Sequence, residues 1–234
     1  MLAVPTAAAQ LAWPLLPDQR WLPAAAAVSW FVTAATHAWA SRGKAWALGL
    51  VALVGGVSLV VEWVQAQLGT VYGPASSSGP FGLAPTGLPL LAPLLWVAAL
   101  YSALIIGRAL SPRLVPLAGG WALASWSLFL EPTLVHSGYR VWSHPEPGLP
   151  QLPGVPLTCY AGWLAFSVLL VWMAHNWLPA TPGAARGVPI ALHLWLIGCG
   201  VATNLLLDRG WVAAVGGTAM AVVALPLLAL LWQS

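Results

Sequence analysis

Glu62 is the residue whose position in this 234-residue chain is most unusual for its type. It lies inside an apolar run, where an ionisable group costs about 2.5 to 3.5 kcal/mol to insert and has to face the protein interior. Gly55, Ser58, Gln65 and Gly69 share one helix face with it at three- and four-residue steps. The carboxyl is therefore expected to point at neighbouring helices, either to hold them together by hydrogen bonds or to do chemistry.

A second carboxyl, Glu131, shares a similar face with Gly120, Ala124 and Ser127. Two inward carboxyls suit acid–base chemistry. Burial can keep one of them protonated as a donor, while the other, nearer water or Arg140, stays ionised as an acceptor. The alternative is that Glu131 lies at the membrane interface with Arg140 as its solvated partner.

The sequence offers no metal or cofactor motif. Its histidines are single, without an HxxxH or HxxHH box, and Cys159 and Cys199 stand alone in apolar segments. A haem held by two intrahelical histidines remains an alternative. Lys44 is the only lysine and lies in a polar link, so a retinal Schiff base is excluded. We expect no metal and no cofactor. The histidines are His37, His136, His144, His175 and His193.

Sixteen tryptophans suggest both interfacial belts and an aromatic cavity whose ring faces could stabilise a carbocation. The cavity candidates, close to the loops, are Trp96, Trp142 and Trp163. Belt positions at the ends of apolar runs are Trp21, Trp39, Trp46, Trp177, Trp211 and Trp232.

Elements that position these residues must be membrane helices, because 60% of the residues are hydrophobic and only 6% are charged. The length allows about seven spans and no additional soluble domain. We expect an all-α, polytopic transmembrane helix bundle that forms one integral membrane domain over residues 1–234, with 1–17 as an interfacial or partial helix. The spans are expected near 22–40, 45–68, 88–107, 114–130, 155–178, 188–207 and 211–232.

Two long loops, 69–87 and 131–154, interrupt otherwise short links. The parity of the spans places both loops at the same end of the bundle, where they could form one lid. Basic residues are more numerous at the other end, which favours loops on the non-cytoplasmic side of a bacterial cytoplasmic membrane. The basic residues are scattered along the chain, which argues against nucleic acid as a partner.

Two ordered sets of residues resemble the carotenoid-biosynthesis membrane family of CruF-like carotenoid 1,2-hydratases, over about residues 55 to 175. The first set is Glu62, Gly69, Tyr72, Phe81-Gly82, Pro89 and Trp96. The second is Glu131-Pro132, Gly138-Tyr139-Arg140-Val141-Trp142 and Gly154-Val155-Pro156 through Gly162-Trp163.

The resemblance implies an enzyme, a hydro-lyase that adds water to the terminal C1–C2 double bond of an acyclic carotenoid end group. Protonation would give a tertiary cation, so the site needs an acid, aromatic faces and a water with its base. The implied catalytic residues are Glu62, Glu131, His136 and Arg140. The implied substrate-binding residues are Tyr72, Phe81, Trp96, Tyr139, Trp142, Tyr160 and Trp163.

The expected partners are an acyclic or monocyclic carotenoid and the lipid bilayer, and other carotenoid-pathway enzymes are candidates. One alternative is a non-catalytic carotenoid- or lipid-binding membrane protein, and another is a different isoprenoid-modifying enzyme such as a cyclase. Prenyl transfer is disfavoured because Asp18 and Asp208 are the only aspartates, so an aspartate-rich diphosphate motif is missing.

Overall fold

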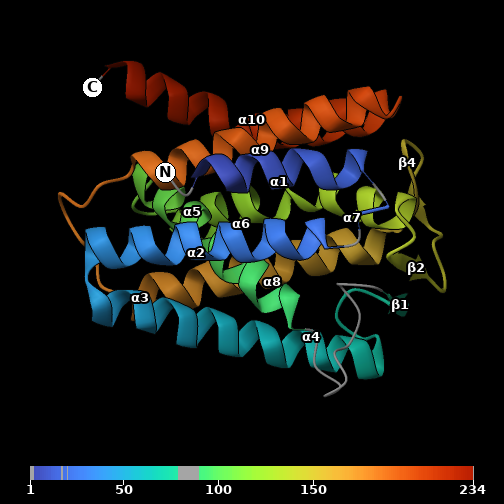
Figure 1. Ribbon diagram of the computed structural model, residues 1–234. Coiled ribbons are helices and arrows are strands. Elements are labelled where there is room, and N and C mark those ends of the chain that lie inside the picture. Colours follow the sequence, from blue (N-terminus) through green and yellow to red (C-terminus); the bar gives the residue numbers. More distant parts are fainter. Residues whose placement is uncertain (1–2, 17, 20, 79–89, 234) are drawn as a thin grey trace.

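Helices make up most of the computed structural model, which describes residues 3–16, 18–19, 21–78 and 90–233. They run side by side along one direction, with α9 and α10 at one side of the bundle and α3 and α4 at the other (Figure 1). The expected all-α bundle is confirmed. The N-terminal half contains α1 (Ala3–Leu15), α2 (Leu22–Arg42), α3 (Lys44–Leu50), the π-helical turn η1 (Val51–Gly55), α4 (Gly56–Leu68) and α5 (Leu91–Leu110). The other half contains α6 (Val115–Ala124), α7 (Ser127–His136), α8 (Leu157–Trp177), α9 (Gly187–Leu206) and α10 (Gly210–Gln233).

Five helical segments of the described chain are long and apolar enough to cross a membrane. They agree with five of the seven expected spans. The expected span at 22–40 forms α2, which carries Thr33, Thr36 and His37 and is not among the five. The segments are Lys44–Leu68, Leu91–Leu110, Leu157–Trp177, Gly187–Leu206 and Gly210–Gln233.

The seventh expected span, 114–130, is divided into α6 and α7 by a tight turn. The amides of Leu128 and Phe129 bond carbonyls three residues earlier, at Ser125 and Trp126. Next to this turn the hydroxyls of Ser125 and Ser127 bond the carbonyls of Ala122 and Ala124, which is how serine competes with regular helix. The face from Gly120 to Glu131 therefore does not run straight, and Glu131 lies in the middle of α7 and not at a helix end.

The first 17 residues were expected to form an interfacial or a partial helix. Within them, α1 is a 13-residue helix that packs along α2 and α9. Thr6 is fully buried and hydrogen-bonds Thr33 of α2, with 3.0 Å between the hydroxyl oxygens. This segment is therefore a partial helix inside the bundle.

α5 is the central helix, because it contacts α2, α4, α6, α8, α9 and α10. Glycines allow the closest approaches. A Cβ at Gly119 of α6 would lie 2.9 Å from the carbonyl oxygen of Ala103, and one at Gly120 would lie 2.5 Å from a methyl of Val168 in α8. The adjacent glycines thus pack α6 between two helices of its own chain.

The described parts of the two long loops meet at one end of the bundle, as their parity predicted (Figure 1). Strand β1 (Ala75–Ser77) of the first loop pairs antiparallel with β2 (Arg140–Trp142) of the second. A second pair, β3 (Gly148–Leu149) with β4 (Leu152–Pro156), leads directly into α8. The pairing fixes Arg140 and Trp142 relative to the end of α4.

Most of the tryptophans expected at the interface are exposed, on helices or, for Trp21, at the start of α2. Trp21, Trp39, Trp177, Trp211 and Trp232 have exposed side chains. Trp46 differs, because it is buried and its indole N–H donates to the carbonyl oxygen of Pro179 over 3.1 Å.

Candidate active site

Glu62 points from α4 toward α5 and the first long loop. One of its carboxylate oxygens, Oε1, accepts a 2.8 Å hydrogen bond from the indole N–H of Trp96 and a 3.4 Å one from the hydroxyl of Tyr72. Ser58 and Gln65 on the same helix face are buried, whereas Val60 and Leu68 are exposed. The inward orientation expected from the helical spacing is thus observed.

Gln65 lies one helical turn beyond Glu62 and hydrogen-bonds the loop segment that places Tyr72 beside the Glu62 carboxylate. Its side-chain oxygen accepts the amides of Val71 and Tyr72 at 3.0 and 2.8 Å, and its amide nitrogen donates to the carbonyl of Gly73 at 2.6 Å. Gly73 has a φ of +104°, a conformation that favours glycine. One buried side chain therefore shapes the whole turn.

The Tyr72 ring is 2% exposed. Burial, and then the negative charge of Glu62, raise the pKa of Tyr72 well above its ordinary value. The hydroxyl consequently stays protonated and can only donate to the Glu62 carboxylate.

Glu131 approaches from the opposite side, on α7, and is 2% exposed. Its Oε1 accepts a 3.1 Å hydrogen bond from the indole N–H of Trp163 in α8. Its other oxygen, Oε2, is buried and has no hydrogen-bond partner within the described part of the chain. This oxygen is available to a bound molecule.

An aromatic stack joins the two carboxylates. The rings of Trp96 and Trp163 are 4.4 Å apart with 28° between their planes, and each indole donates to one carboxylate. Tyr72 stacks on the same Trp163 ring at 6.2 Å, and Trp126 meets it edge-on at 6.1 Å. The geometry supplies the π faces that a carbocation needs, next to two carboxyl groups.

Arg140 supplies the positive charge of the site from strand β2. Its guanidinium lies 5.5 Å from the centre of the Trp142 ring, and its Nε is buried without a partner in the described residues. Burial alone lowers the pKa of Arg140, but the carboxylates of Glu131 and Glu62 outweigh burial and raise this pKa above the ordinary value. Arg140 thus stays charged and interacts with both carboxylates.

Both carboxylates and Arg140 line one small cavity of about 30 Å³. A cavity needs only about 10 to 15 Å³ on this measure to hold one water, which also requires two to four polar partners. The remaining wall is apolar and aromatic, made of Ala92, Leu95, Trp96, Trp126, Leu130, Leu134 and Trp163. The cavity has room for a water between two carboxyl groups and the guanidinium of Arg140.

Five described residues expected at the site lie outside this cavity lining, and of these Tyr72 still contacts Glu62. Tyr139 packs on Trp13 at 6.4 Å, and Trp142 is buried under Arg140. Tyr160 lies in the first turn of α8, with a buried hydroxyl that has no partner in the described chain. His136 is exposed and lines a separate, open groove beside Asp208 and Arg209. Phe81 lies outside the described residues.

Trp126 is the main site residue that sequence analysis missed. It lies in the turn between α6 and α7 and contacts both Trp163 and Trp30. The available signal was the Ser125-Trp126-Ser127 sequence, since two serines around one residue mark a place where a helix can be interrupted.

Within the described residues, no group of three or more histidine, cysteine or acidic side chains could hold a metal ion. In a comparison with known families, residues 22–230 match the model of a family described as carotenoid biosynthesis protein. No curated protein and no solved structure gives a significant match.

Proposed function

The chain belongs to the carotenoid biosynthesis protein family, and we propose that it is a membrane-embedded carotenoid hydratase. It adds water to the terminal C1–C2 double bond of an acyclic end group and leaves a tertiary alcohol. The substrate is an acyclic or monocyclic carotenoid that reaches the site from the lipid bilayer.

One observation carries this proposal. The half-buried carboxyl group of Glu62 and the buried one of Glu131, each hydrogen-bonded by one member of a stacked tryptophan pair, line a water-sized cavity together with Arg140. Hydration of an isolated double bond requires a proton donor, stabilisation of a cation, and a positioned water with a base. The cavity contains residues able to perform each of these tasks.

Glu62 is assigned as the acid and Glu131 as the base. Of the two carboxylates, Glu131 contributes more to raising the pKa of Arg140, so the positive charge of Arg140 acts mainly on Glu131. Its unpaired Oε2 is free to accept a proton from water. Glu62 lies within the candidate span Lys44–Leu68, where an ionised group is costly, whereas Glu131 lies in α7, outside the five candidate spans.

In the reaction, the π electrons of the double bond take the proton of Glu62 at the less substituted carbon. This leaves a tertiary cation beside the faces of Trp96 and Trp163. The water oxygen bonds to that cation, and Glu131 takes one proton from the water. Transfer of a proton from Glu131 back to Glu62 restores the site, so the net change is the addition of one water molecule.

The test is pigment analysis in two hosts, one that accumulates an acyclic carotene and one that accumulates a monocyclic carotene with an acyclic end. A hydratase gives a product heavier by one water in at least one host. Unchanged pigment that co-purifies with the protein would favour a non-catalytic carotenoid-binding protein. A product of unchanged mass with a new ring would favour a cyclase.

A further inference from the structure

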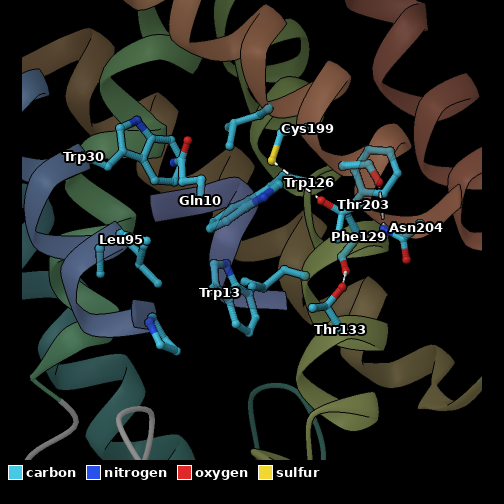
Figure 2. A pocket seen from close by; sticks show the side chains of 16 residues that line it. Gln10, Trp13, Trp30, Leu95, Trp126, Phe129, Thr133, Cys199, Thr203 and Asn204 are labelled. Atoms are coloured by element: carbon cyan, nitrogen blue, oxygen red, sulfur yellow. Dashed lines mark hydrogen bonds between the residues drawn. The ribbon is translucent and has the colours of Figure 1, made fainter. Parts of the chain in front are cut away.

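A second cavity lies on the other side of Trp126 and is larger, at about 80 Å³. Figure 2 shows its lining, to which α1, α2, α5, α7 and α9 contribute, and which is mostly apolar. We call this cavity the end-group chamber.

The end-group chamber and the carboxylate cavity share a wall. Leu95, Trp126 and Leu130 line both of them. Trp126 meets Trp30 edge-on at 5.2 Å on the chamber side and Trp163 edge-on at 6.1 Å on the carboxylate side. A ligand in the chamber is therefore separated from the carboxylates by a few side chains only.

Three polar atoms in the chamber lining are buried and have no hydrogen-bond partner in the described chain: Gln10 Oε1, Trp30 Nε1 and Asn204 Oδ1. Their side chains are 8%, 1% and 1% exposed. In Figure 2, Trp30 and Gln10 lie on one side of Trp126 and Asn204 on the other. Because unpaired buried polar atoms are costly, such a set in an apolar chamber points to a ligand with a polar group of its own.

A hydroxyl accepts hydrogen bonds and has one hydrogen to donate, so it matches the donor Trp30 Nε1 together with one acceptor, Gln10 Oε1, which lies on the same side of Trp126. A carboxylate would repel the two acceptor oxygens, and a pure hydrocarbon would leave all three atoms unpaired. An isoprenoid end that carries one alcohol fits both the apolar wall and the polar atoms.

We propose that the end-group chamber binds the hydroxylated end of a carotenoid, next to the cavity in which that hydroxyl is formed. This inference rests on the proposed function for the origin of the alcohol. It assigns Trp30 and Gln10 to recognition of the hydroxyl and Ala27, on α2, to the apolar wall. The chain then retains the alcohol more strongly than the parent hydrocarbon.

The experiment titrates the purified full-length protein with an acyclic carotene and, separately, with its terminal tertiary alcohol, and measures the pigment retained after gel filtration. Extraction and chromatography of the retained pigment identify what is bound. We expect at least about fivefold stronger retention of the alcohol, which corresponds to about one net hydrogen bond. Gln10→Leu, similar in volume but without the acceptor, should weaken that preference.

Filling the chamber tests its location. Ala27→Leu adds bulk to the lining, whereas Ala25→Leu makes the same change on the same helix at a residue outside it. The first variant should lose at least about tenfold in retention of the alcohol, and the second should behave as the unaltered chain. If Ala27→Leu does not fold, Cys199→Leu fills the chamber from α9.

Equal retention of the two pigments would overturn the inference and would mean that water serves the three polar atoms. The inference would also be overturned if the Ala27→Leu variant retained as much of the alcohol as the Ala25→Leu variant does. Failure of the proposed function looks different, because the unaltered chain would then prefer the alcohol without ever producing it from the carotene.

Discussion

Replacement of Gln65 by leucine tests whether one buried side chain positions the tyrosine of the site. Gln65→Leu keeps the volume of the side chain but removes three hydrogen bonds of 2.6 to 3.0 Å to the turn at 71–73. Each net hydrogen bond contributes about 0.5 to 1.5 kcal/mol, so the free energy of unfolding should fall by about 1.5 to 4.5 kcal/mol if the turn stays buried. If the turn instead moves out to water, the loss of stability is smaller, but Tyr72 leaves Glu62.

Either outcome lowers turnover, which distinguishes this position from an ordinary polar residue in a membrane helix. Gln67→Leu is the matched control, because Gln67 is exposed on the same helix. The assay measures thermal unfolding of both purified variants and the hydrated pigment formed by each. The reasoning is refuted if Gln65→Leu is as stable and as active as Gln67→Leu.

Three further predictions concern the surroundings of the carboxylates. Gly162→Ala should destabilise the protein by about 1 to 3 kcal/mol and lower activity, because the new Cβ would lie 2.3 Å from the carbonyl oxygen of Val71. Gly198→Ala, whose new Cβ meets nothing within 4 Å and which lies inside α9, should be at least as stable as the unaltered chain. Trp163→Phe retains an aromatic face but removes the hydrogen bond to the Glu131 carboxylate, which is worth about 1.5 to 3 kcal/mol. Turnover should therefore fall about 10- to 100-fold while the pigment is still bound. Unchanged turnover would show that this hydrogen bond is not needed. Arg140→Met removes the charge that both carboxylates share and should lower the rate of hydration more than it lowers pigment retention, measured on the same preparation.

Local periodicity predicted the parts of the site that depend on one helix. The small and polar residues on the face of Glu62 indicated that this carboxyl points inward, and Ser58 and Gln65 are indeed buried there. Span parity placed the two long loops together, and the pairing of β1 with β2 confirms it. These features follow from 3.6-residue repetition and from the connection of antiparallel neighbours.

The remaining features depend on contacts between distant segments, which one sequence does not reveal. Trp126 looked like one tryptophan among sixteen, and only the turn between α6 and α7 places it between two cavities. His136 shares a polar loop region with Arg140 in sequence but lines a different groove, because α7 ends at His136 and the chain then turns into β2. The end-group chamber is lined by residues of five helices, so no local sequence pattern predicts it.

The most direct test of the central claim follows the oxygen and the two carboxyls in a single assay. Purified chain in lipid is given an acyclic carotene in heavy-oxygen water, and the product is analysed by mass spectrometry. The account predicts labelled tertiary alcohol from the unaltered chain and from Glu146→Gln, a control in the exposed loop. It predicts that Glu62→Gln and Glu131→Gln each form at least about 100-fold less of this alcohol. Full turnover in both of these variants, or oxygen that comes from dioxygen and not from water, would contradict it.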